Sequence, residues 1–232
     1  MLIRKDGQET RQKILEAACR VFGEKGYRDA THAEICRIAG VNTAAINYHF
    51  GSKDALYRAA WNHAAAQVDR VYPVDGGVSS EAPVEERLRA NVRSLLARRA
   101  DSEKLGHFHN LRMMEIVNPT GLVDDAIAEW RQKARAYTRS LLQQLLGPGA
   151  SEDDVELCEM SVVSQSLMAQ RGHHKGKRKM LWRFGERDVN RLTDHIVRFC
   201  LAGIGAIRED IEKRESDRQS SLAPVEGRNV AK

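Results

Sequence analysis

The sequence has no closely spaced pair of cysteines. Its four cysteines, Cys19, Cys36, Cys158 and Cys200, are widely scattered, and none belongs to a CxxC motif. A zinc site or redox motif therefore has little support, and we expect small buried thiols in a reducing cytoplasm. There is no run of about 18 apolar residues, so we expect no membrane span. No apolar stretch of roughly 7–15 residues lies near Met1, which argues against a secretory signal.

The chain also lacks a strong excess of one charge. Its 232 residues include 37 Lys and Arg against 32 Asp and Glu, and 42% are hydrophobic, which is ordinary for a globular protein and excludes wholesale disorder. Residues 1–60 hold ten basic and seven acidic residues, whereas Arg171–Arg191 holds eight basic and two acidic ones. We expect the second stretch to be a solvated loop; the alternative is a site for an anionic effector or a second DNA contact.

Alternating strand patterns are nearly absent, and apolar residues recur at helical spacing, so we predict an all-α fold. The first helix should begin between Asp6 and Thr10 and end near Gly26. Thr31 and Glu34 form a capping box for a short second helix that stops at Gly40. Asn42 should cap a third helix to about His49, and Ser52 a fourth to about Val71.

A loop is expected over 73–83, because it is rich in glycine, serine and proline. Beyond it, the pattern predicts helices over 84–100, 106–117, 124–146, 153–170 and 188–207. Residues 209–232 have almost no large apolar side chains, and we expect this tail to be disordered. We therefore divide the chain into an N-terminal helix-turn-helix domain (1–60), a larger helical domain (61–208) and a tail (209–232).

The segment 31–50 has the length of a helix-turn-helix, and a glycine separates its two short helices. The second helix of such a motif fits the major groove of B-DNA. Its outward residues are small or polar, as a reading helix requires. Ala44 can touch a thymine methyl group, and Asn47 can pair with adenine. Hydroxyl, imidazole and ammonium groups can bind phosphates. The predicted DNA-binding residues are Thr31, Asn42, Thr43, Ala44, Asn47, Tyr48, His49 and Lys53.

This segment resembles the TetR-type one-component transcriptional regulators. The resemblance lies in Thr31–Ile35, Ile38–Val41 and Ala45–Tyr57, and it extends back through Ile14–Ala18 without gaps, over about 50 residues in all. Two positions depart from the commoner pattern, which has serine in place of Asn42 and often tyrosine in place of Asn47. The sequence pattern of this segment is similar to that of the CecR-like subgroup, and the segments Leu111–Thr120 and Ser164–Leu167 are similar to that subgroup as well.

The resemblance implies a C-terminal helical domain that dimerises and often encloses a small-molecule pocket. The last two expected helices, Asp153–Gln170 and Asp188–Ile207, would pair with those of a second copy; the apolar stripe of the latter also fits an intrachain core. The candidate pocket residues, each of which could instead be simple core, are Phe108, Met113, Met114, Trp130, Tyr137, Met160 and Trp182. His107 and His109 form an HxH pair, which we interpret as surface histidines rather than a metal site.

These features predict a homodimeric repressor that binds a pseudo-palindromic DNA operator and is released by an unknown small-molecule effector. We expect no cofactor, no metal and no membrane partner. The alternatives are a helical protein-interaction module that does not bind DNA and an α-helical enzyme. No catalytic triad, pair of carboxylates or nucleotide-binding loop supports the enzyme.

Overall fold

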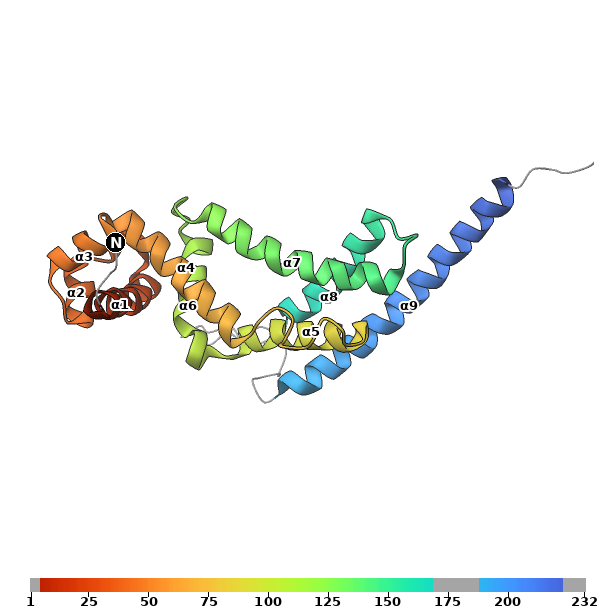
Figure 1. Ribbon diagram of the computed structural model, residues 1–232, viewed down its shortest axis with the longest axis horizontal. Helices are drawn as coiled ribbons and strands as arrows, with labels where there is room; N and C mark the ends of the chain where they lie inside the picture. The colour runs from red at the N-terminus through yellow and green to blue at the C-terminus, as the bar shows by residue number, and fades with distance from the viewer. Residues whose placement is uncertain (1–4, 169–187, 223–232) are drawn as a thin grey trace, which may run out of the picture.

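The structure is a computed structural model, and it describes residues 5–168 and 188–222. Within these residues every regular element is an α-helix, as the periodicity predicts (Figure 1). The helices are α1 (Lys5–Asp29), α2 (His32–Ala39), α3 (Thr43–Phe50), α4 (Lys53–Val71), α5 (Val84–Ala100), α6 (Ser102–Val117), α7 (Asp124–Leu146), α8 (Glu152–Met168) and α9 (Val189–Leu222). No described helix combines the length and apolarity needed to cross a bilayer.

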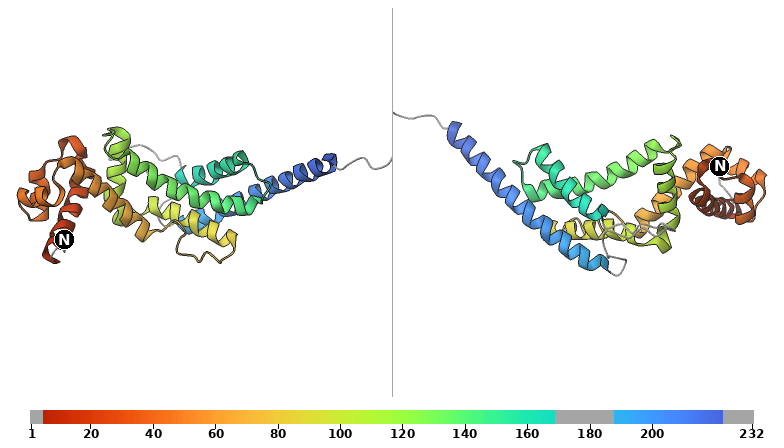
Figure 2. Two further views of the ribbon diagram at one scale, coloured as in Figure 1. Left: turned by 45° about the horizontal axis from the view of Figure 1, so that its top comes forward. Right: turned by 180° about the vertical axis from the view of Figure 1, so that it is seen from behind.

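The helices form a small head and an elongated body. The head, made by α1, α2 and α3, lies at one end, α4 leads from it into the body, and α9 projects from the opposite end (Figures 1 and 2). Gly26, with φ 78°, interrupts the helical backbone near the end of α1, at the residue where the sequence predicted a stop. Glycine accepts this left-handed φ without a Cβ clash.

Two clusters of buried side chains hold the molecule together. The first joins the head to α4 and α6, and its fully buried members include Phe22, Ile35, Ile46 and Leu111. The second joins α5, α7, α8 and α9 and includes Leu88, Leu141 and Ile204. The first cluster contains residues from both sides of position 60, and α4 runs through that position without a break. The head therefore shares its core with the body.

The loop between α4 and α5 is fixed by side chains of α5. Asn91 donates to the carbonyl of Val74 at 2.8 Å, Ser94 to that of Pro73 at 2.6 Å, and Arg98 to that of Tyr72 at 2.7 Å. All three donors are buried. Buried polar groups of this kind are stable only when they are hydrogen-bonded, so the loop and α5 fix each other.

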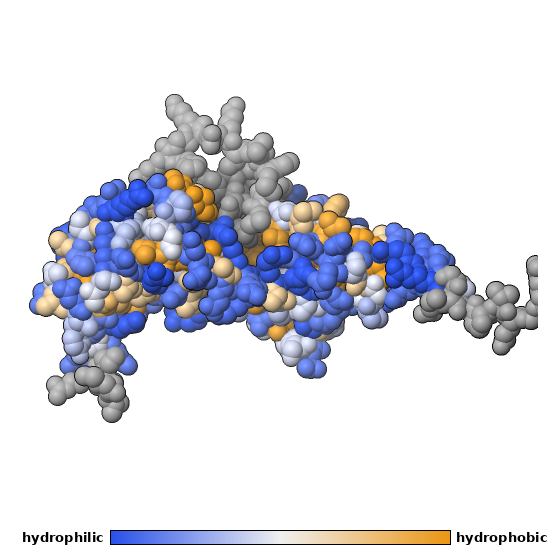
Figure 3. All heavy atoms as spheres, turned by 90° about the horizontal axis from the view of Figure 1, so that it is seen from above, coloured by the Kyte–Doolittle hydropathy of each residue, from blue (hydrophilic) through white to orange (hydrophobic). Residues whose placement is uncertain are grey.

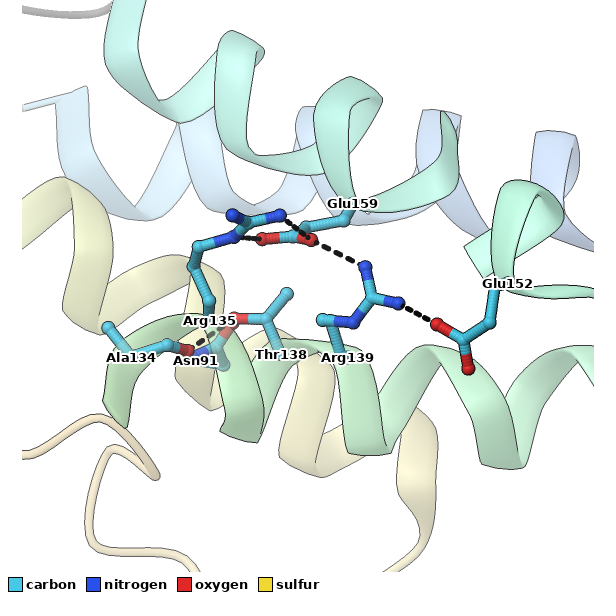
Figure 4. Close-up of polar contacts among 7 residues, drawn as sticks. All are labelled: Asn91, Ala134, Arg135, Thr138, Arg139, Glu152 and Glu159. Carbon is cyan, nitrogen blue, oxygen red and sulfur yellow. Dashed lines mark hydrogen bonds and ion pairs between the residues drawn. The ribbon is translucent and has the colours of Figure 1, made fainter. Parts of the chain in front are cut away.

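An ionic network joins α7 to α8 (Figure 4). The Arg135 guanidinium donates to both carboxylate oxygens of Glu159, at 2.7 and 3.0 Å, and Arg139 adds a third contact at 3.1 Å before it reaches Glu152. Glu159 is buried, and Arg135, followed by Arg139, lowers the pKa of its carboxyl. The network therefore holds a charged carboxylate between the two helices.

Two sequence-based boundaries were wrong. The expectation of a disordered tail fails for residues 209–222, because α9 continues to Leu222 and Ile211 is buried in the second cluster. Ile211 lies four residues after Ile207, so a single apolar residue per turn extends the packed face. The sixth helix begins at Ser102 rather than at Gly106, because an isolated glycine is tolerated inside a helix. Residues 223–232 lie outside the described residues.

Candidate nucleic-acid interface

The helix-turn-helix is built by local side-chain capping. The Thr31 Oγ1 accepts the Glu34 N–H at 3.2 Å, and the Asn42 Oδ1 accepts the Ala45 N–H at 3.0 Å. Between them Gly40, with φ 68°, ends α2 in the left-handed conformation. Side-chain caps such as these are each worth about 1 kcal/mol to a helix, which matters for elements as short as α2 and α3.

The face of α3 that points away from the core carries most of the predicted reading residues. Ile46 anchors the helix and is fully buried, whereas Thr43, Ala44 and Asn47 are exposed. Tyr48 is 76% exposed, which is unusual for an aromatic side chain in the absence of a partner. The arrangement presents a small, polar and aromatic surface to an external partner.

The other predicted contacts are partly engaged within the chain. Asn42 uses its side-chain oxygen as the cap of α3, and the hydroxyl of Thr31 also donates to the Glu34 carboxylate at 3.2 Å. The Lys25 ammonium, paired with Glu34, lowers the pKa of that carboxyl. Thr31 and Asn42 thus shape the interface in addition to any contact they make across it.

Two further residues flank α3. His49 is half-buried, with its ring 5.0 Å from that of Tyr48 in an edge-to-face arrangement. The Lys53 ammonium donates to the carbonyl of Arg28 at 3.2 Å and lies 4.7 Å from the Tyr27 ring centroid. Lys53 therefore lies against the end of α1 in the free protein. The Ser52 hydroxyl oxygen accepts a hydrogen bond from the Ala55 N–H at the start of α4.

The candidate effector residues within the described part of the chain lie in different places. Phe108 and Trp130 pack together with ring centroids 5.2 Å apart, but Met113 and Met160 are exposed on different helices. Met114 contacts the head near Gly26, and Tyr137 packs against the second core cluster. Trp182 and most of Arg171–Arg191 lie outside the described residues. Apolar spacing selected these residues, and spacing does not separate a cavity wall from a core.

A polar link between head and body was not predicted from the sequence. The hydroxyl of Tyr57 in α4 donates to Glu115 of α6 at 2.5 Å, and both residues are buried. Glu115 also accepts the Thr120 N–H at 3.1 Å and the Thr120 hydroxyl at 2.9 Å. A signal was present: Glu115 lies four residues after Leu111 and seven after Phe108, on the apolar stripe of its helix.

The N-terminal head and the C-terminal body each match a known protein family. Residues 14–60 match the family model described as bacterial regulatory proteins, tetR family. Residues 84–204, just over half of the chain, match the C-terminal domain of the HTH-type transcriptional dual regulator CecR. The second match ends inside α9, so the projecting end of that helix lies beyond it.

Individual relatives agree with this assignment. The HTH-type transcriptional regulator SrpR of Pseudomonas putida is 24% identical over 152 residues, which cover 66% of this chain and 68% of SrpR. A putative TetR-family regulator from Mesorhizobium loti MAFF303099 has a TM-score of 0.62 at 22% identity and covers 87% of this chain and 98% of its own. A putative transcriptional regulator from Pseudomonas aeruginosa PAO1 has a TM-score of 0.66 at 20% identity and covers 88% and 95%.

The solved structures share the fold, and the two family models cover the head and most of the body. Members of this family are transcriptional regulators and not enzymes. The chain belongs to the TetR family of transcriptional regulators, with a DNA-binding helix-turn-helix followed by a CecR-type C-terminal domain.

Proposed function

We propose that this regulator is a homodimeric repressor that places α3 of each copy in the major groove of a pseudo-palindromic operator. The observation that carries the proposal is the exposed face of α3, with Thr43, Ala44, Asn47 and Tyr48 held on a helix that is capped at its start and anchored by Ile46. One helix of this length reads few base pairs, so two copies, with half-sites roughly 34 Å apart, are needed for specificity.

Exposed apolar side chains on α8 and α9 support dimerisation. Leu157 and Met160 of α8 are each 58% exposed, and Phe199 of α9 is 64% exposed. The surface view shows hydrophobic surface on the body, whereas the projecting end of α9 is hydrophilic (Figure 3). Large apolar side chains at such exposure are typical of a surface that is covered in the assembled protein.

The DNA contact is tested by operator affinity at several salt concentrations. Tyr48→Ala should weaken specific binding about tenfold and leave the slope of log affinity against log salt unchanged, because a phenol is uncharged and its contact with a phosphate releases no counterion. The control is Arg208→Ala, which removes a charge from α9 far from the head and should leave both the affinity and the slope unchanged. Equal affinity of Tyr48→Ala and the wild type would remove Tyr48 from the interface.

The dimer is tested by sedimentation. Phe199→Glu or Leu157→Glu should convert a dimer into monomers, because each places a charge in an apolar contact. Met113→Glu is the control: Met113 is also an exposed apolar residue, but it lies on α6, and its substitution should leave the dimer intact. A wild-type chain that sediments as a monomer, or a dimer that survives both α8 and α9 substitutions, would contradict this interface.

Release from DNA requires an effector that favours one of two arrangements of the paired heads. Only a difference in its affinity for the two arrangements can shift their populations. The shared core of head, α4 and α6, together with the bond from Tyr57 to Glu115, supports a mechanical connection between the body and the head.

A further inference from the structure

A cavity of about 350 Å³ opens between α4, α6 and α7. Its walls include Trp61 of α4, Arg112 and Ile116 of α6, and Trp130 and Arg131 of α7. A volume of this size is enough for a small organic molecule. The aromatic side is rigid, because Phe108 packs against both tryptophans, with ring centroids 5.5 Å from Trp61 and 5.2 Å from Trp130.

Two arginines in this wall have no anionic partner in the part of the chain that the structure describes. Among the described residues, neither Arg112 nor Arg131 makes an ion pair or a hydrogen bond, although Arg112 is half-buried. Burial lowers the pKa of Arg112, and the charge of Arg131 lowers it further. Two guanidinium groups in the wall of one cavity are stabilised by an anion that pairs with both.

The acidic side chains of the cavity do not fill this role. Glu115 is buried, and its carboxylate oxygens are occupied by Tyr57 and by the backbone and hydroxyl of Thr120. Asp124 is exposed at the start of α7, where the helix dipole favours a negative charge. Among the described residues, the arginine pair therefore makes no ion pair with either carboxylate of the cavity.

A second unsatisfied group lies in the same wall. Trp61 is 1% exposed, and its Nε1 has no hydrogen-bond acceptor among the described residues. The indole of Trp130, by contrast, donates to Asp69 at 3.3 Å and has Arg98 against its ring. A buried donor without an acceptor is uncommon in proteins, so this indole calls for a partner beyond the described residues, such as ordered water or a ligand.

We propose that this cavity binds an organic anion with an apolar body: its carboxylate or similar group pairs with Arg112 and Arg131, and its body packs on Trp130 and Ile116. The inference rests on the proposed effector response and names the chemical class of the effector. Arg112 and Glu115 are three residues apart on α6, and Glu115 bonds to Tyr57, four residues before Trp61 on α4. An anion that moves Arg112 therefore acts on the helix that enters the head.

The experiment compares two probes of nearly the same shape by isothermal titration calorimetry on the full chain. 1-Naphthoate is an anion at pH 7, and 1-naphthamide is neutral. The wild type should bind naphthoate about tenfold more tightly than naphthamide, since a charge-assisted pair is worth this much. Inorganic sulfate should compete weakly, because it has no apolar body to pack against Trp130 and Ile116.

Substitutions of the two arginines test which side chains cause the preference for naphthoate over naphthamide. Arg112→Gln should reduce naphthoate affinity about tenfold and abolish the preference over naphthamide. Arg131→Gln, at an exposed position that should not affect folding, should have the same direction of effect. The matched control is Lys133→Gln, which removes one positive charge from α7 outside the cavity wall and should leave both affinities unchanged.

Three results would overturn the assignment: equal affinities for the two probes, no binding of naphthoate at about millimolar concentration, or an equal loss in Lys133→Gln and Arg112→Gln. Operator binding is measured separately without any probe. A chain that binds operator but fails the probe comparison refutes the anion assignment alone, whereas a chain that passes the comparison but binds no operator refutes the proposed regulator.

Discussion

Replacement of Tyr57 by phenylalanine tests the link between head and body. The substitution keeps the ring, which packs 4.8 Å from Phe22 and 5.2 Å from Tyr27, and it removes only the hydroxyl that donates to Glu115. A hydrogen bond to a charged group contributes about 1.5–3 kcal/mol, and the two bonds from Thr120 still satisfy part of the carboxylate. We expect Tyr57→Phe to lower the free energy of unfolding by about 2 kcal/mol.

This magnitude is large enough for a simple assay. For a protein of this size, 1 kcal/mol corresponds to roughly 2–4 °C in melting temperature, so the variant should melt about 4–8 °C lower. The control is Tyr48→Phe, which removes a hydroxyl from an exposed ring and should change stability by less than about 0.5 kcal/mol. A melting temperature equal to that of the wild type would show that the Tyr57–Glu115 bond contributes no net stability.

The same bond has a pH signature. Burial, reinforced by the hydrogen bond to Glu115, raises the pKa of Tyr57 far above its ordinary value of 10.0. Above about pH 10, Tyr57 stays protonated in the folded state but loses its proton in the unfolded state. The contribution of Tyr57 to the free energy of unfolding is therefore constant below about pH 10 and falls as the pH rises above it. Tyr57→Phe should therefore lose less stability than the wild type between about pH 10 and 11 in urea titrations.

Three further predictions concern Glu159, Cys19 and Gly106. Glu159→Gln should destabilise the chain by about 1–2 kcal/mol at pH 7. Because Arg135 lowers the pKa of Glu159, the wild type should lose this extra stability as the pH falls below about 4.5. Stability curves of the two proteins that run parallel from pH 6 to 3 would contradict the pairing of Glu159 with Arg135. Burial raises the pKa of Cys19 to about 12, so wild-type stability should fall above pH 9 by up to about 1.4 kcal/mol per unit more steeply than that of Cys19→Ala, as followed by urea unfolding. Gly106→Ala should stabilise α6 by about 0.5–1 kcal/mol, whereas Gly23→Ala should not, because its Cβ would lie 3.0 Å from the Cβ of Asn110; equal thermal shifts would refute the close approach.

The head could be predicted from sequence because its determinants are local. Thr31 and Asn42 cap helices that begin at the next residue, and Gly40 adopts the positive φ that ends α2. Each of these signals depends on neighbours within four residues in the chain. The exposed face of α3 follows directly, since Ile46 fixes which side of the helix is buried.

The cavity could not be predicted because it depends on contacts between distant segments. Spacing alone named Met113 and Met160 as candidate pocket residues, and spacing does not specify which side chains line a cavity; in the described structure both are exposed. The arginines of the wall look like ordinary surface charges in a helical pattern, and only the packing of α4, α6 and α7 brings them together. The helix-turn-helix is thus determined by local sequence, whereas the cavity is a property of the assembled body.

The core shared by the head and α6 limits how freely such regulators can exchange parts. Gly23 approaches Asn110 closely, and Phe22, Leu56 and Leu111 belong to one buried cluster that spans the boundary expected at residue 60. A chimera cut there would join two half-interfaces that were never selected together. Exchange of DNA-reading heads between relatives should succeed only when the facing surface of α6 is transplanted with the head, and drift in either surface should be matched in the other.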